Sequence, residues 1–137
     1  MSKGIRTSSL ETTALQYFSP ETVIQANDKV LAFSNALPLT GHYRKDADFI
    51  HTSSDGQKFD VSVASLVASP SFKYFGNGRG VTMYSFLDEA GQLFYSTVFS
   101  AAEPESHYVL DGLTHNEVII PNAHSTDTHG FSEPVFA

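Results

Sequence analysis

The chain has 137 residues, of which 41% are hydrophobic and 17% charged, a size and composition that suit one globular domain. It contains no cysteine, which excludes disulfide frameworks, thiolate zinc sites and cysteine nucleophiles. The sequence contains neither a run of 18 apolar residues nor the apolar stretch of a signal peptide, so we expect a cytoplasmic protein without a membrane span.

The net charge of −7 is unevenly distributed along the chain. All eight Lys and Arg residues lie at or before Arg79, whereas eight of the fifteen acids follow it. An acidic segment repels nucleic acid at long range. Any contact with DNA is therefore expected to come from the first half of the chain, or from chain outside this sequence.

The first predicted helix spans residues 20–35. Ser19 is a favourable N-cap, and Pro20 suits the first helical position, where its missing N–H costs nothing. Apolar residues then recur at roughly helical spacing. Pro38 is expected to end the helix, and a polar linker is expected over 42–48.

Strands are predicted next. A strand over 49–54 is expected to carry Asp55 at its C-terminal end, with a turn at 56–57 and a second extended segment over 59–63. Residues 64–80 are rich in Ser, Gly and Asn and are interpreted as an insert before the next strand.

The clearest pattern is a hairpin with strands over 81–87 and 92–99. A helix from 104 to about 116 follows, and then an extended segment over 123–127. The order hairpin, helix and further strand favours an α/β fold with a mixed sheet. It matches the first part of a ribonuclease-H-like domain, in which the last of these strands is added beside the first.

Two aspartates stand in similar surroundings. Asp55 and Asp127 each lie beside hydroxyl side chains and shortly before a glycine, 72 residues apart (127 − 55). Carboxylates on neighbouring strands suit Mg²⁺, and paired magnesium ions catalyse in-line displacement at phosphorus. Turn chemistry offers an alternative, in which both aspartates are turn or cap residues. The residues alone favour that alternative, because a chain with 15 acids offers many such pairs.

Histidines flank the second aspartate. His124, Asp127 and His129 are the residue types of a metal site, which would make the chain a histidine and aspartate metallohydrolase. On an extended strand, however, residues 124 and 129 point to opposite faces, so a shared ion would need a bend. One of the two histidines is instead expected to be solvated or to face DNA, and His51 is expected to be packed or solvated.

A glycine-rich loop over 76–80 precedes a strand, so it is not a dinucleotide-binding fingerprint. Arg79 lies in this loop, and Lys73 precedes it beside the aromatic pair Tyr74 and Phe75. Such a segment could approach a phosphate backbone and a splayed base. An ordinary surface loop over a buried aromatic pair is the alternative.

Four blocks of sequence together resemble the catalytic region of Tn-three-type replicative transposases. They occur in the order and spacing of that family, and the resemblance covers roughly residues 20–137. The blocks are SSDGQKF at 53–59, KYFGNGRGVT at 73–82, YVLDGL at 108–113 and TDTHGF at 126–131.

The resemblance implies a DDE transposase, with 1–47 as an N-terminal helical segment and 48–137 as the first part of a ribonuclease-H-like catalytic domain. It implies that Asp55 and Asp127 are catalytic metal ligands for Mg²⁺, with Mn²⁺ as a substitute. The implied reaction is hydrolytic nicking of transposon ends, followed by attack of the freed 3′-hydroxyl on target DNA. The residues expected to contact DNA are Lys58, Lys73, Arg79 and His129. The implied location is the bacterial cytoplasm, in association with the nucleoid through DNA.

The family's third acid is a glutamate well over a hundred residues beyond the second, and Glu133 is too close to Asp127 to be its equivalent. We therefore expect a truncated catalytic domain that is inactive alone. A non-catalytic module that self-associates or pairs with the full-length transposase is an alternative, because an unfinished sheet would leave an edge or apolar face uncovered.

Overall fold

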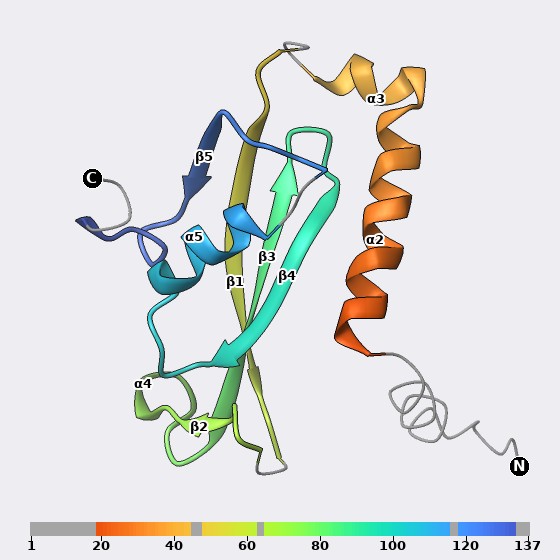
Figure 1. Ribbon diagram of the computed structural model, residues 1–137. Helices are drawn as coiled ribbons and strands as arrows, with labels where there is room; N and C mark the ends of the chain where they lie inside the picture. Colours follow the sequence, from red (N-terminus) through yellow and green to blue (C-terminus); the bar gives the residue numbers. More distant parts are fainter. Residues whose placement is uncertain (1–18, 45–47, 63–64, 116–117, 134–137) are drawn as a thin grey trace, which may run out of the picture.

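The computed structural model describes residues 19–44, 48–62, 65–115 and 118–133, which form a five-stranded sheet flanked by helices (Figure 1). The elements in chain order are α2 (Pro20–Asn35), α3 (Pro38–Tyr43), β1 (His51–Asp60), β2 (Ser69–Pro70), α4 (Phe72–Phe75), β3 (Arg79–Asp88), β4 (Leu93–Ser100), α5 (Ser106–Thr114) and β5 (Ala123–Thr126). None of the described helices combines the length and the hydropathy that crossing a membrane requires.

The sheet is mixed, as the order of elements predicted. Strand β3 pairs antiparallel with β1 on one side and with β4 on the other, and β5 runs parallel to β1 on its far side. The short strand β2 pairs with the beginning of β3. Helix α5 connects β4 to β5, so β5 returns to the side of the sheet where β1 lies, and β1 separates it from β3. Within the described strands β5 is outermost on that side.

The first helix has the predicted bounds, and the N–H of Thr22 donates to the Oγ of Ser19 at 3.3 Å. The first helix ends before Pro38, as predicted, but Pro38 then opens a second helix, α3, which includes 42–43 of the linker predicted over 42–48. A proline suits the first turn of a helix as well as the position after one. The Thr40 hydroxyl donates to the carbonyl oxygen of Ser34 at 2.6 Å and joins the two helices.

Strand β1 is longer than predicted, so Asp55 lies within it rather than at its end. The expected turn at 56–57 is wrong, because β1 pairs with β3 without interruption from Thr52 to Asp60. Residues 59–60 of the extended segment predicted over 59–63 belong to this same strand, and residue 63 lies outside the described residues. The ladder of hydrogen bonds along β3 overrides the local turn preference of Asp-Gly. The hairpin of β3 and β4 confirms the prediction with slightly longer strands.

The core lies between the sheet and α5, which crosses in front of the strands in Figure 1, while α2 stands beside β4. Aromatic rings supply most of its volume, and Gly112 of α5 lets the helix approach: a Cβ at this position would lie 2.1 Å from the ring of Phe86. The buried cluster consists of Leu31, Tyr84, Phe86, Phe94, Phe99, Val109 and Ile119.

The opposite face of the sheet is open in the described part of the chain. Met83, Leu87 and Val98 point away from α5 and are 37%, 39% and 51% exposed. Asp55 lies on this same face, because side chains alternate along β1.

Candidate functional site around two aspartates

The alternation of side chains along β1 decides where Asp55 lies. Thr52 and Ser54 are buried against the core, whereas Ser53 and Asp55 are exposed on the open face. Oδ1 of Asp55 accepts a hydrogen bond of 2.8 Å from the N–H of Gly56. The carboxylate is therefore held by the backbone of its own strand while remaining accessible to solvent.

Asp127 lies in the turn directly after β5, and its carboxylate organises that turn. Oδ1 accepts the N–H groups of His129 and Gly130 at 3.0 and 3.1 Å, and Oδ2 lies 2.9 Å from Nδ1 of His129. The hydrogen bond from His129 is the main cause that lowers the pKa of Asp127 below its ordinary value of 3.8. The ionised form is thus favoured, as a ligand for a cation requires.

The sheet pairs the strand that contains Asp55 with the strand that directly precedes Asp127. Ser54 of β1 pairs directly with Thr126 of β5. Asp55 directly follows Ser54 in the sequence, and Asp127 directly follows Thr126. Parallel strands lie about 4.8 Å apart. The two aspartates, 72 residues apart in sequence (127 − 55), thus each directly follow one member of the last pair in this register.

On the covered side of the same strands, His124 is packed rather than solvated. Its Nδ1 lies 2.8 Å from the Thr52 hydroxyl and its Nε2 lies 2.8 Å from the Ser54 hydroxyl. Burial, with a smaller effect of His51, lowers the pKa of His124, so the neutral ring is favoured. His129, in contrast, is exposed.

The alternative metal site at His124, Asp127 and His129 does not fit this arrangement. Both ring nitrogens of His124 are engaged by β1, whereas His129 interacts with the carboxylate of Asp127. Among the residues that the structure describes, no three His, Asp or Glu side chains gather as a set of metal ligands. A histidine and aspartate metallohydrolase is therefore not supported.

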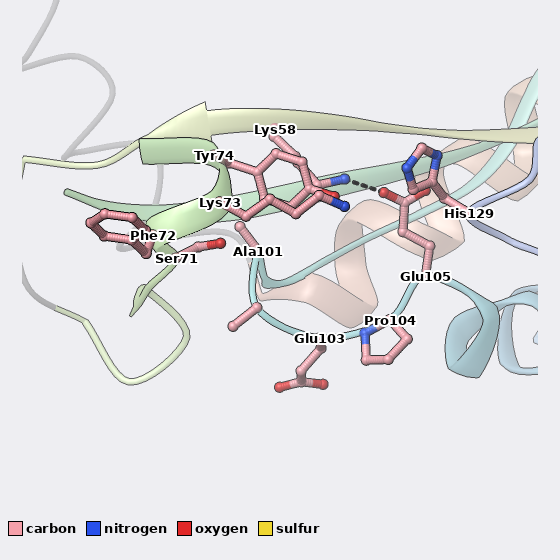
Figure 2. A pocket seen from close by; sticks show the side chains of 11 residues that line it. Lys58, Ser71, Phe72, Lys73, Tyr74, Ala101, Glu103, Pro104, Glu105 and His129 are labelled. Atoms are coloured by element: carbon pink, nitrogen blue, oxygen red, sulfur yellow. Dashed lines mark hydrogen bonds and ion pairs between the residues drawn. The ribbon is translucent and has the colours of Figure 1, made fainter. Parts of the chain in front are cut away.

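The residues predicted to contact DNA are only partly brought together. Lys58, Lys73 and His129 line one pocket of about 430 Å³ between β1, α4 and the segment that enters α5 (Figure 2). Both lysine ammonium groups lie over the ring of Tyr74, at 4.7 and 4.8 Å from its centroid. Arg79 is exposed at the start of β3 and does not line this pocket.

Two contributors to this region were missed in the sequence. Glu105, near the start of the helix predicted from 104, is buried and forms an ion pair with Lys58 that Figure 2 shows as a dashed line. Tyr84 was interpreted as a strand residue, yet its hydroxyl bonds to Ser54 beside the first aspartate. The only signals were the helix start at Pro104 and the polar tip of an otherwise apolar ring.

The donor set at the two aspartates fits a hard cation in kind. Both carboxylates are exposed oxygen donors, and Mg²⁺ prefers oxygen ligands and keeps several waters. The described residues supply two carboxylates here and no third ligand beside them.

Comparison with known proteins identifies the family. The family model described as Tn3 transposase DDE domain matches residues 1–137. The transposase for transposon gamma-delta of Escherichia coli (strain K12) is 31% identical over 121 residues, which cover 88% of this chain and 12% of that protein. The transposase for transposon Tn2501 of Escherichia coli is 34% identical over 135 residues, 98% of this chain and 13% of that protein.

The transposase for transposon Tn1546 of Enterococcus faecium is 33% identical over 86 residues, 62% of this chain and 9% of that protein. No solved structure matches significantly. The chain thus spans about an eighth of the length of the first two curated relatives. From its sequence, the chain belongs to the Tn3 transposase DDE domain family.

Proposed function

We propose that residues 48–137 form the first part of a ribonuclease-H-like transposase catalytic domain, in which Asp55 and Asp127 hold Mg²⁺, and that 1–47 is a helical segment leading into it. The observation that carries this proposal is the parallel register of β1 and β5, which pairs Ser54 with Thr126, the residues that directly precede the two aspartates. The strand order supports the fold assignment, because three antiparallel strands are followed by a helix and a strand parallel to the first.

The proposed chemistry is phosphoryl transfer on DNA. A bound divalent ion supplies Lewis acidity at the scissile phosphate and lowers the pKa of an attacking water. The role of Asp55 and Asp127 is to fix the position of that ion against the phosphate. Water would replace the 3′-oxygen at phosphorus and leave a 3′-hydroxyl at the transposon end. That hydroxyl would then displace a 3′-oxygen in target DNA, with one P–O bond formed for each one broken.

The pocket in Figure 2 is our candidate contact for the DNA strand. Tyr74 presents a ring flanked by Lys58 and Lys73, and an aromatic face beside cations suits an unstacked base and its phosphate. His129 joins this pocket to the turn that holds Asp127. Arg79, further along the sheet, would contact the backbone separately.

Metal binding tests the core of the proposal. Calorimetric titration of the 137-residue chain with Mn²⁺ is expected to show weak binding that Asp55→Asn and Asp127→Asn each abolish. Asp60→Asn is the matched control, since it removes an exposed carboxylate at the end of the same strand. Binding that survives both substitutions, or that Asp60→Asn also abolishes, contradicts the proposal.

We also expect no DNA nicking by this chain alone. The described residues contain no group of three carboxylate or histidine side chains that could hold an ion, whereas the resemblance implies a third ligand from elsewhere in the protein. A supercoiled plasmid carrying transposon ends, incubated with the chain and Mn²⁺, should remain supercoiled. Nicking that disappears with Asp55→Asn would show that two acids suffice.

The open face of the sheet favours a second role, in which this chain pairs with itself or with a full-length transposase. Met83, Leu87 and Val98 form an exposed apolar strip, and contiguous exposed apolar surface commonly marks an interface. Light scattering that shows a monomer, together with no binding to the intact enzyme, would exclude this role.

A further inference from the structure

A chain of buried hydrogen bonds runs beneath the two aspartates. The Ser54 hydroxyl lies 2.8 Å from that of Tyr84, which in turn lies 3.1 Å from the Thr126 hydroxyl. Ser54 directly precedes Asp55 and Thr126 directly precedes Asp127. We infer that Tyr84, Thr126 and His124 are positioning residues that fix the separation of the two aspartates. This inference rests on the proposed function.

Tyr84 provides the bridge between the strands. It comes from β3, is fully buried, and reaches across β1 to β5 with a single hydroxyl. Burial is the main cause that raises its pKa, against a smaller lowering by the hydrogen bonds with Ser54 and Thr126, so the hydroxyl keeps its proton. A rigid ring with a satisfied hydroxyl is well suited to set a distance, because it has few rotamers and its hydrogen bonds have strict geometry.

The protons of the chain can be assigned without a conflict when His124 is neutral. The Thr52 hydroxyl donates to the carbonyl oxygen of Ala123 at 3.4 Å, so it accepts from Nδ1–H of His124. Nε2 then accepts from Ser54, Ser54 accepts from Tyr84, and Tyr84 accepts from Thr126. Each hydroxyl donates once and each of these side-chain acceptors is used. A fully satisfied buried network favours one arrangement over its alternatives.

Two packing contacts hold the network in place, one from Phe86 and one from Gly130. The ring of Phe86 stacks on His124, with centroids 5.8 Å apart and planes at 28°. A Cβ on Gly130 would lie 1.9 Å from the Thr126 hydroxyl oxygen and 2.8 Å from that of Tyr84. The turn containing Asp127 is therefore seated directly on the two hydroxyls. Loss of the Thr126 hydroxyl should loosen the turn, because Gly130 packs directly against that hydroxyl.

Groups that orient metal ligands matter because a cation needs both carboxylates at fixed positions. Their loss typically lowers metal affinity about 10- to 100-fold. The test compares Tyr84→Phe and Thr126→Val, which remove one hydroxyl each, with Thr126→Ser, which keeps it. Thr82→Val is the matched control. Its hydroxyl is buried on the same face of β3 as Tyr84, without a hydrogen-bond partner among the described residues.

In Mn²⁺ calorimetry of the full chain, we expect Tyr84→Phe and Thr126→Val to weaken binding about tenfold or more. Thr126→Ser, which keeps the hydroxyl, should bind Mn²⁺ with an affinity within about threefold of the wild type, and Thr82→Val should bind with unchanged affinity. Equal affinities for all five proteins would overturn the inference. So would equal losses in Thr82→Val and Thr126→Val, because the effect would then follow general destabilisation.

A second measurement does not depend on metal. Hydrogen exchange of the Gly130 amide, followed by NMR, reports on its bonds to the carboxylate and carbonyl oxygens of Asp127. We expect exchange about tenfold faster in Thr126→Val and unchanged in Thr82→Val. If the wild type binds no Mn²⁺ but exchange changes as expected, the proposed function fails and the positioning of the turn stands. If exchange is unchanged in Thr126→Val, the positioning fails whatever the metal result.

Discussion

The two faces of the sheet differ sharply, although the same strands build both. Toward α5, β3 presents Tyr84 and Phe86, which are fully buried in an aromatic core. On the other face, the same strand presents Met83 and Leu87, which stay more than a third exposed. Along β1 the covered face has buried hydroxyls, and the open face has Asp55.

This difference separates the buried hydroxyls of β1 from the exposed carboxylate of Asp55, which we propose as a metal ligand. Alternation along a strand places consecutive residues on opposite faces, so Ser54 anchors β1 while Asp55, the next residue, stays accessible. A catalytic group held by buried neighbours on its own strand gains rigidity without being buried itself. Experiments that perturb one face and leave the other intact test this separation.

The largest expected effect is on the covered face. Phe86→Ala removes a ring that packs against α5, other aromatic rings and His124, and should lower the free energy of unfolding by about 3–5 kcal/mol. Leu87→Ala, the next residue on the open face, should cost less than about 1 kcal/mol, because little burial is lost. Urea denaturation followed by circular dichroism measures both. Similar losses would mean that the open face is covered in solution.

The second prediction concerns Gly112, where α5 approaches the sheet closely. Gly112→Ala places a methyl group 2.1 Å from the Phe86 ring, so we expect a loss of about 1–3 kcal/mol from overpacking. Gly41→Ala is the matched control in α3, where nothing lies within 4 Å of the added methyl group. It should be neutral or stabilising by up to about 1 kcal/mol. The same denaturation experiment separates the two.

The ion pair of Lys58 and Glu105 should contribute less to the free energy of unfolding than the Phe86 ring does, because Lys58 is partly exposed. Lys58→Met leaves the buried carboxylate of Glu105 without this partner, and we expect a loss of about 1.5–3 kcal/mol. Adding Glu105→Gln should recover part of that loss, since the unpaired charge is then removed. A double-mutant cycle on thermal or urea unfolding measures the recovery, and a purely additive result would contradict the pairing.

The smallest expected effect concerns the turn at Asp127. His129 is the main cause that lowers the pKa of the Asp127 carboxyl, so His129→Ala should raise that pKa toward 3.8. A depressed folded-state pKa contributes stability that is present above the unfolded value near pH 4 and lost as the pH falls through the folded value. The contribution to unfolding is small, because the carboxylate is 45% exposed.

Carbon-13 NMR titration of the Asp127 carboxyl measures this shift. His115→Ala is the matched control, since it removes the exposed histidine beside Asp111 and leaves the turn intact. A pKa of Asp127 that stays low in His129→Ala would assign the depression to the backbone N–H groups of His129 and Gly130 instead.

Local patterns in the sequence were sufficient where a signal and its consequence lie within a few residues. Ser19 and Pro20 defined the start of α2, and the hairpin of β3 and β4 followed from its β-rich segments. The same reasoning failed at Gly56-Gln57, directly after Asp55, where a turn was predicted and the strand continues. The dipeptide prefers a turn only when no neighbouring strand offers a ladder of hydrogen bonds.

The sequence predicted the two aspartates of the candidate site but not the residues that support them. Asp55 and Asp127 came from the resemblance to a family, and the assignment of these two residues to metal remains a prediction. The pairing of Lys58 with Glu105 and the bridge through Tyr84 had no sequence signal. Each joins residues at least 30 positions apart, and such contacts depend on how the strands are ordered.

The sequence by itself determined the family, the secondary elements with local start signals, and the two aspartates as candidates. Only the tertiary structure decided that β5 pairs with β1 in the register that opposes Ser54 and Thr126, and that a hydroxyl chain through Tyr84 joins these two residues. The physical reason is that side-chain pattern fixes which face of a strand a residue occupies. Register and strand order, in contrast, are set by packing and hydrogen bonds across the whole sheet.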